Sequence, residues 1–209
     1  MHQIVKSVFL VLLILINEAL IIAGLQYYIS YQSQKREYQK ELQNDIYEDI
    51  ASEMKCFPIP LAYQNEIFFE DTYGAARDNG GHEGCDIMDV KNEAGRIPVV
   101  SATDGVITNV GWLFLGGYRI GITSEHDIYY YYAHLDSYAA GISAGKEVKA
   151  GELLGFMGNT GEGEEGTNGK FDVHLHFGIY LNDKNGKEYA INPYQVLQKL
   201  ENKKRTLTF

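Results

Sequence analysis

Four of the six histidines in the sequence lie in three short clusters, and histidines that lie near a carboxylate are typical of a metal site. The clusters are centred on His82 with Asp86, on His134, and on His174 with His176. Side chains two apart in a β-strand point to the same face. If the apolar segment around them is a strand, His174 and His176 therefore stand side by side, about 7 Å apart at Cα.

Each cluster by itself also fits a role without a metal. His174 and His176 fit two surface side chains on a solvated strand face, and His82 and Asp86 fit a turn that the aspartate caps. A straight strand would hold His82 and Asp86 about 13 Å apart, too far to share one ion. A bend at Gly84 would turn both side chains inward, where a histidine and a carboxylate form an ordinary zinc pair at about 2.0–2.2 Å from the metal.

The lone His134 follows a run of four tyrosines, residues 129–132. Strand alternation predicts that Tyr130, Tyr132 and His134 share one face. The tyrosines fit either ordinary packing of a strand or contacts with a substrate. His126 lies in a polar turn and is expected to have no role in the chemistry.

Short apolar segments separated by glycine-rich turns predict the strands that must position these clusters. The chain holds 22 glycines, and Asn185-Gly186 is a typical two-residue hairpin turn. Asn192 is predicted to cap a C-terminal helix whose first residue is Pro193. The sequence thus predicts a mainly β, antiparallel domain closed by a short helix, with strands at Pro98–Ala102, Val106–Trp112, Tyr118–Thr123, Ile128–His134, Leu153–Met157, Val173–Leu181 and Glu188–Ile191.

The N-terminal segment predicts a membrane anchor. Val8–Leu25 is apolar except for Asn17, Glu18 and Gly24, close to the roughly 20 residues that a transmembrane helix needs. A cleaved signal peptide is the alternative, but no clear cleavage site with small residues follows. Basic residues occur on both sides of the segment, so charge alone leaves the orientation open.

A polar segment without glycine or proline follows the anchor and predicts a spacer helix. Tyr38, Leu42, Ile46, Ile50 and Met54 recur at every fourth residue, which gives one helical stripe. The stripe fits a simple spacer or a coiled coil that would make the chain a dimer. The prolines at 58 and 60 end the helix. The predicted organisation is a transmembrane anchor at 1–30, a helical spacer at 31–55 and, at 56–209, the domain that carries the histidine clusters.

Composition narrows the classes of partner. The net charge is −10, which argues against DNA or RNA as a partner because binding to phosphates needs a basic surface. The two cysteines, Cys56 and Cys85, are too few for a fold built on disulfides. A single bridge between them and two separate thiols are both consistent with the sequence. Cys85 should face away from Asp86 by strand alternation, so it is not expected to bind a metal.

Taken together, the three clusters resemble the lysostaphin-type (LytM-like) zinc endopeptidases, which cut the peptides of bacterial cell walls. The family pattern is His-x-x-x-Asp, then a lone His, then His-x-His. The resemblance covers nearly everything from Phe57 to Leu200. It includes a framework of Pro98-Val99, Asp104-Gly105-Val106, Gly116-Gly117, Tyr132-Ala133-His134-Leu135, Gly145–Gly151 and Gly155–Gly161. The stretch Asn159–Asp172 departs from compact members in being longer and more acidic, and it is expected to rim the cleft.

The resemblance implies one zinc ion per chain, bound by His82, Asp86 and His176, with His134 and His174 as catalytic histidines that do not bind the ion. Three protein ligands leave a fourth zinc position for water, as in catalytic sites. The two unligated histidines would then orient or deprotonate that water and stabilise the oxyanion.

The implied function is that of a membrane-anchored zinc endopeptidase acting on peptidoglycan peptides, either a cross-bridge or a stem peptide, outside the cytoplasmic membrane. The alternative is a zinc-bearing scaffold that binds a cell-wall, division or sporulation partner without hydrolysing it. A metal-binding regulator of separate amidases is a weaker third possibility, since regulatory relatives typically lack the ligands that are present here.

Overall fold

The computed structural model describes the backbone of residues 2–77 and 80–205, and the side chains of residue 6 and of residues 15–77 and 80–201. Contacts divide the chain into two compact units, Met1–Glu48 and Asp49–Phe209. Helix α1 runs without a break from His2 to Glu53, so its last turn belongs to the second unit. One helix therefore covers both the predicted anchor (1–30) and nearly all of the predicted spacer (31–55), because that stretch contains no proline and Gly24 is its only glycine.

Within the described residues, no helix holds a stretch both long and apolar enough to cross a membrane. The first part of the expected anchor, residues 8–14, lies outside the described side chains. Of the apolar stripe, Tyr38 and Leu42 are exposed, whereas Ile50 and Met54 are buried in the second unit. The coiled-coil dimer stays a prediction.

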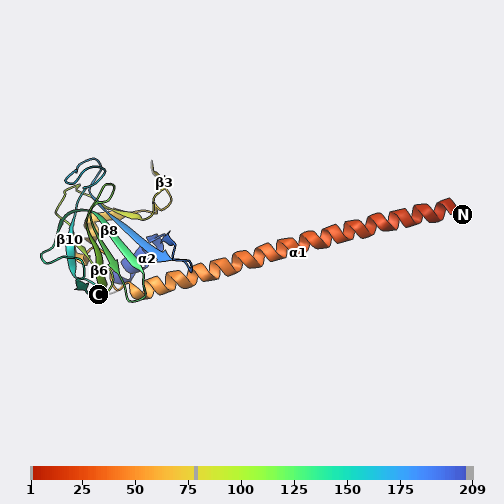
Figure 1. The fold of residues 1–209 in the computed structure, drawn as a ribbon, viewed down its shortest axis with the longest axis horizontal. Helices are drawn as coiled ribbons and strands as arrows, with labels where there is room; N and C mark the ends of the chain where they lie inside the picture. The colour runs from red at the N-terminus through yellow and green to blue at the C-terminus, as the bar shows by residue number, and fades with distance from the viewer. Residues whose placement is uncertain (1, 78–79, 206–209) are drawn as a thin grey trace. The chain divides into compact units, whose positions relative to one another are not determined.

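In the described part of the second unit, ten strands form one antiparallel sheet (Figure 1). The sheet contains β1 (Ile67–Phe69), β4 (Cys85–Asp89), β5 (Pro98–Val100), β6 (Gly105–Leu113), β7 (Gly117–Thr123), β8 (Tyr129–Tyr138), β9 (Glu147–Val148), β10 (Leu153–Met157), β11 (His174–Asn182) and β12 (Glu188–Ile191). The main order is β1-β4-β11-β8-β7-β6-β9; β10 pairs with β5 and β8, and β12 pairs with β11. A small hairpin of β2 (Ala76–Arg77) and β3 (Gly80–Gly81) precedes β4, and a 3-10 helix, η1 (Leu61–Glu66), precedes β1.

The mainly β, antiparallel architecture is confirmed, and the seven predicted strands all have counterparts. The Asn185-Gly186 turn joins β11 to β12 as a hairpin. Strand β5 (Pro98–Val100) pairs with β10, which comes much later in the chain, and not with β6, the next strand in sequence. The sequence did not delimit β4, which was expected only as a bent strand around Gly84 that carries Asp86. It missed β1, β2, β3 and β9, which are only two or three residues long.

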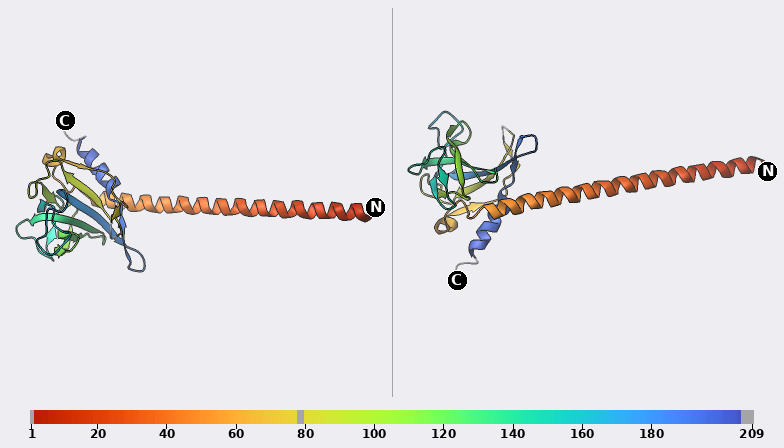
Figure 2. Two further views of the ribbon diagram at one scale, coloured as in Figure 1. Left: turned by 90° about the horizontal axis from the view of Figure 1, so that it is seen from above. Right: turned by 60° about the horizontal axis from the view of Figure 1, so that its bottom comes forward.

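The C-terminal helix α2 (Tyr194–Arg205) begins as predicted, since the Tyr194 backbone N–H donates to Asn192 Oδ1 at 2.9 Å. The helix lies beside β1, where the ring centroids of Phe69 and Tyr194 are 5.8 Å apart (Figure 2). Val196 and Leu197 are fully buried. The core also takes Tyr130, Tyr132, Leu175 and Phe177 from one face of the central strands, which leaves the other face of those strands for chemistry.

Candidate metal centre and active site

Strand β11 lies in the middle of the sheet and carries two of the predicted site histidines. His176 pairs with Asp86 of β4 on one side and with Ala133 of β8 on the other. Leu175 and Phe177 are completely buried on the opposite face. The prediction that His174 and His176 share one face is therefore confirmed, and the neighbouring strand places Asp86 on that same face.

His82 reaches this face because the chain bends at Gly84, as the sequence predicted. A Cβ at Gly84 would lie 2.5 Å from Cε1 of His176 and 2.8 Å from the carbonyl oxygen of Phe177. The His176 ring therefore packs directly on the Gly84 backbone. The His82 ring is fixed from behind by Thr72, whose carbonyl oxygen lies 2.9 Å from Nδ1. The glycine thus provides the close approach that brings His82 next to His176.

Three electron-rich atoms converge at one point on this face. His82 Nε2 lies 2.8 Å from His176 Nδ1 and 3.0 Å from Asp86 Oδ1, and His176 Nδ1 lies 3.1 Å from the same oxygen. Three ligands of a tetrahedral zinc at about 2.0–2.2 Å would be about 3.3–3.6 Å apart. The triangle is therefore slightly tighter than a zinc site, and a small outward movement of the rings would fit the ion.

The contacts around the three atoms also suit a cation at this point. A carbonyl oxygen only accepts, so Nδ1 of His82 carries a proton, and Nε2 is the ring nitrogen that faces His176 and Asp86. Burial would raise the pKa of Asp86, but hydrogen bonds with His176 and His82 outweigh it and hold the pKa below its usual range. Asp86 Oδ2 accepts from Arg77 Nη2 at 2.8 Å. Two imidazole nitrogens and one carboxylate oxygen form a donor set that suits zinc, so the residues fit the implied ion.

His134 and His174 form a second pair beside the triangle. Their ring centroids are 4.7 Å apart, and His174 Nε2 lies 3.7 Å from Asp86 Oδ1. Each Nδ1 donates to a backbone carbonyl, that of Thr160 at 2.8 Å for His134 and that of Asp172 at 2.7 Å for His174. Burial lowers the pKa of His134 to about 3, with help from the charges of the other two histidines, and burial also lowers the pKa of His174. Both rings are therefore neutral near pH 7, with the lone pair on Nε2.

The prediction that Tyr130, Tyr132 and His134 share one face of the strand is wrong. Tyr130 and Tyr132 point into the core, where Tyr130 Oη donates to Glu53 and Tyr132 Oη accepts from the Ala102 N–H. His134 has φ 61°, a left-handed conformation, which turns its side chain to the other face. The tyrosine that shares the site face is Tyr131, whose ring centroid is 5.9 Å from that of His176.

A groove of about 1100 Å³ lies beside the site; Tyr131 lines it, but none of the five site residues does. Tyr131 connects the groove to His176, and Tyr129 and Tyr180 continue its floor. Leu113, Phe114 and Leu115 of the β6–β7 turn line another part of it and are exposed. No sequence pattern predicts the groove, because its lining comes from strands that are distant in the chain.

The segment Asn159–Asp172, expected to rim the cleft, reaches the histidines through Thr160, Phe171 and Asp172, whose carbonyl holds His174. Thr160 supplies the carbonyl that holds His134, and the Phe171 ring packs on His134 and His174 with centroid distances of 4.6 and 5.1 Å. Gly163 accepts a hydrogen bond from Trp112 Nε1. The segment therefore orients the His134 and His174 rings in addition to flanking them.

The cysteines are two thiols, and no disulfide joins them. Cys56 Sγ donates to the Ser101 carbonyl, and Cys85 Sγ donates to the Glu70 carbonyl. Cys85 is buried on the face opposite Asp86, as strand alternation predicted. Of the two alternatives that the sequence left open, separate thiols are the one observed. His126 is an exposed turn residue, as expected.

Comparisons with known proteins agree with this geometry. The model of "Peptidase family M23" matches residues 80–193, which include all five site residues. The chain is 39% identical over 149 residues to the L-Ala-D-Glu endopeptidase of Bacillus subtilis, a match that covers 70% of this chain and 44% of that protein. This chain thus spans less than half the length of that relative.

Two solved structures have the same fold. A lytM protein from Ruminococcus gnavus is 52% identical with a TM-score of 0.67, covering 72% of this chain and 62% of that one. The catalytic domain of lysostaphin from Staphylococcus simulans is 26% identical with a TM-score of 0.51, covering 67% of this chain and 98% of that one.

Proposed function

The chain belongs to peptidase family M23, and from that membership we propose that it is a zinc-dependent endopeptidase that hydrolyses peptide bonds of bacterial peptidoglycan. The similarity to an L-Ala-D-Glu endopeptidase and to lysostaphin supports this substrate class. The bond that is cut is in a stem peptide or in a cross-bridge.

One observation carries the proposal: three converging donor atoms lie next to two neutral histidines. His82, Asp86 and His176 would hold the ion through the atoms that already converge. The two histidines beside them keep an unprotonated Nε2, because each Nδ1 is committed to a backbone carbonyl. A purely structural metal site would be closed by a fourth protein ligand and would not need this second pair.

The bound zinc ion would supply Lewis-acid polarisation of the scissile carbonyl and of the attacking water. His134 and His174 both start as bases, since neither Nε2 has a proton to donate. One of them accepts the proton of the attacking water, and only then becomes a donor able to stabilise the oxyanion or to protonate the leaving amine. Phe171 packs on both rings and helps to fix their orientation.

We also propose that the enzyme works at the outer face of the cytoplasmic membrane. Peptidoglycan lies outside that membrane, so the second unit would be extracytoplasmic and the N-terminus cytoplasmic. The apolar segment 8–25 would be the anchor, an assignment that rests on its sequence alone.

Mass spectrometry of purified peptidoglycan after digestion tests the proposed activity. We expect soluble fragments with a new amino terminus at one type of peptide bond, no release after chelation, and recovery on adding zinc. The His134→Ala variant serves as the inactive control. If the zinc-loaded protein binds peptidoglycan without releasing fragments, the scaffold alternative replaces the enzyme.

A further inference from the structure

The groove beside the metal centre has an acidic lining. Among the described residues that line it, three are acidic, Glu83, Asp127 and Glu188, and none is a lysine or an arginine. His126 also lines the groove, and it is paired with Glu53. A cleft lined by charges of one sign concentrates ligands of the opposite sign. The lining therefore favours a positively charged group of a ligand over an anionic one.

Three tyrosines that line the same groove, Tyr129, Tyr131 and Tyr180, form one aromatic cluster. Their ring centroids are 6.1, 6.3 and 6.4 Å apart, and the rings of Tyr131 and Tyr180 are perpendicular, at 90°. A Cβ at Gly121 would lie 1.9 Å from Tyr129 Oη, and a Cβ at Gly178 would lie 2.7 Å from Tyr180 Cε2. Two of the rings thus lie against glycine backbone. An ammonium group over such rings is attracted by their π-electrons.

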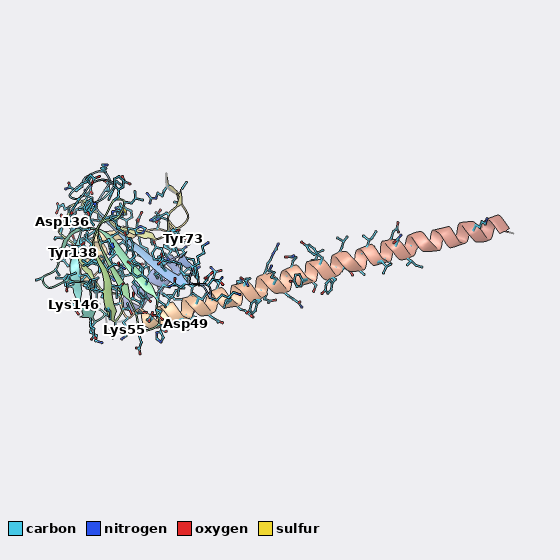
Figure 3. The ribbon with its side chains drawn as sticks, in the orientation of Figure 1. Asp49, Lys55, Tyr73, Asp136, Tyr138 and Lys146 are labelled. Carbon is cyan, nitrogen blue, oxygen red and sulfur yellow. The ribbon has the colours of Figure 1, made fainter. Side chains whose placement is uncertain are left out.

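Acidic residues and Tyr180 meet at one end of this cluster. Tyr180 Oη donates to the backbone carbonyl of Glu83 at 3.3 Å. Glu188 is the first residue of β12, which pairs with the end of β11 that carries Tyr180. Tyr73, labelled in Figure 3, holds β12 in place, since its Oη donates to the Ala190 carbonyl at 3.0 Å. The strand pairing therefore fixes the backbone of Glu188 close to Tyr180.

Charge distinguishes the Tyr180 end of the cluster from the Tyr131 end. Burial raises the pKa of Tyr180, and the negative charges of Glu83 and Glu188 add to that rise. Burial also raises the pKa of Tyr131, to about 12, but there the positive charge of Arg119 opposes the rise. Both phenols are therefore neutral near pH 7. A cation in the groove is more stable beside Tyr180, near the two carboxylates, than beside Tyr131, nearer to Arg119.

We propose that the groove binds the free side-chain ammonium of a diamino acid in the substrate peptide, against the Tyr180 ring and the carboxylates of Glu83 and Glu188. Tyr180 lies four residues from His176 along β11, which is about 13 Å at about 3.3 Å per residue. An extended peptide advances by a similar distance per residue, so the diamino acid lies within about four residues of the scissile bond. The inference rests on the proposed peptidase function.

This ligand distinguishes free stem peptides from cross-linked ones. A side-chain amine is protonated near pH 7, whereas a cross-link through that amine converts it into a neutral amide. The amide has no charge for the carboxylates to attract and makes no cation–π contact. The preferred substrate is therefore a stem peptide whose side-chain amine is not yet cross-linked. An oligoglycine bridge offers no side-chain cation for this site.

Two matched peptides test this inference. One is alanyl-γ-D-glutamyl-lysyl-D-alanine with a free side-chain amine, and the other carries an acetyl group on that amine, which removes the charge. Affinities are measured on the zinc-loaded His134→Ala variant, to prevent turnover, and kcat/KM is measured on the zinc-loaded wild type. We expect the free amine to bind about 5- to 30-fold more tightly, as for a cation–π contact with exposed carboxylates. This preference should shrink at about 1 M salt, where the Debye length is about 3 Å.

Matched variants separate recognition from folding. The double variant Glu83→Gln with Glu188→Gln should bind both peptides with the affinity of the acetylated one. Tyr180→Phe should keep most of the preference, since it keeps the ring, and Tyr180→Leu should lose part of it. Glu147→Gln, at an exposed position of β9 outside the groove, changes net charge in the same direction and should keep the full preference. Tm and zinc content, measured for each variant, confirm that the fold and the metal centre are intact.

The outcomes distinguish this inference from the proposed function. Equal affinity for the two peptides, an unchanged preference in the double variant, or no binding of either peptide overturns the ammonium site. If the wild type cleaves both peptides with equal kcat/KM, the peptidase function holds and the inference fails. If the protein binds the free amine selectively but cleaves neither these peptides nor purified peptidoglycan, the ammonium site stands and the proposed function fails.

Discussion

Two histidines that lie two residues apart on one strand have different surroundings. Nδ1 of His176 points at His82 and Asp86, whereas Nδ1 of His174 is occupied by the Asp172 carbonyl and its Nε2 lies 3.7 Å from Asp86. The geometry therefore separates a residue that shares the metal position from one that lies beside it. A sequence shows only two equivalent histidines.

This separation predicts different zinc contents for alanine variants. His176→Ala leaves two protein ligands, so zinc should be lost together with activity. His174→Ala should retain one zinc per chain and lose about 10²–10⁴-fold in turnover, the usual effect of removing an acid–base group. His134→Ala should behave like His174→Ala. Metal analysis of the purified variants checks this, and loss of zinc from His174→Ala with retention in His176→Ala would reverse the assignment.

Gly84 gives a second prediction at a single residue. The Cβ of Gly84→Ala would collide with His176 and with the Phe177 carbonyl, which cannot move without disturbing β11. We expect a loss of about 1–3 kcal/mol in the free energy of unfolding, as for overpacking in a core, and zinc binding weakened by about 10- to 100-fold, as for residues that support metal ligands.

A nearby glycine provides the control for this variant. A Cβ at Gly81 would meet its nearest atom at 3.8 Å, an ordinary contact. Gly81→Ala should therefore leave unfolding and zinc affinity unchanged. Chemical denaturation and competition with a zinc chelator measure both quantities, and equal behaviour of the two variants would remove Gly84 from the site.

The sequence predicted the site residues better than it predicted the strand that carries His134. Alternation holds in β11 and in β4, so His174, His176 and Asp86 meet as expected. It fails in β8 because His134 adopts a left-handed φ, which a non-glycine residue seldom does. No periodic pattern reveals such a residue. Because of this backbone conformation, His134 shares its face of the sheet with Tyr131 and not with Tyr130 and Tyr132.

At the scale of elements, the end of α1 is joined to the β7–β8 turn by an ion pair. Glu53, the last residue of α1, accepts from Tyr130 Oη at 2.8 Å and lies 2.9 Å from His126 Nδ1. Glu53 is nearly buried, and His126 is exposed. These contacts join residues more than 70 positions apart, so the sequence could not predict them.

The ion pair predicts a dependence of stability on pH. The hydrogen bond to Glu53 and the negative charge of Glu53 raise the pKa of His126 above its ordinary value of 6.5. A raised folded-state pKa adds stability that is complete below pH 6.5 and is lost as the pH rises through the folded pKa. His126→Asn should therefore lower Tm at pH 5.5 and have no effect at pH 8.5. An equal effect at both values would mean that His126 acts through packing and not through its charge.

At the scale of the whole molecule, composition and turn signals predicted the β class and the closing helix, but not the order of the strands. Strand β11 becomes central because it pairs with β4, β8 and β12, which are contributed from before and after it in the chain. Long-range pairing of this kind leaves no local trace. The groove follows from it, and it was not predicted from the sequence.

The proposed location gives the last prediction, which concerns the orientation of the whole chain. If the second unit faces the cell wall, protease added to intact spheroplasts should degrade residues 49–209 while a cytoplasmic marker protein survives. The physical reason is that the substrate lies outside the membrane and the protease cannot cross it. Deleting residues 8–25 should remove the protein from the membrane fraction. Immunoblots with an antibody against the second unit report both results. Full protection of that unit in intact spheroplasts, with degradation only after lysis, would place the catalytic residues on the side without peptidoglycan and would contradict the proposed function as well as the orientation.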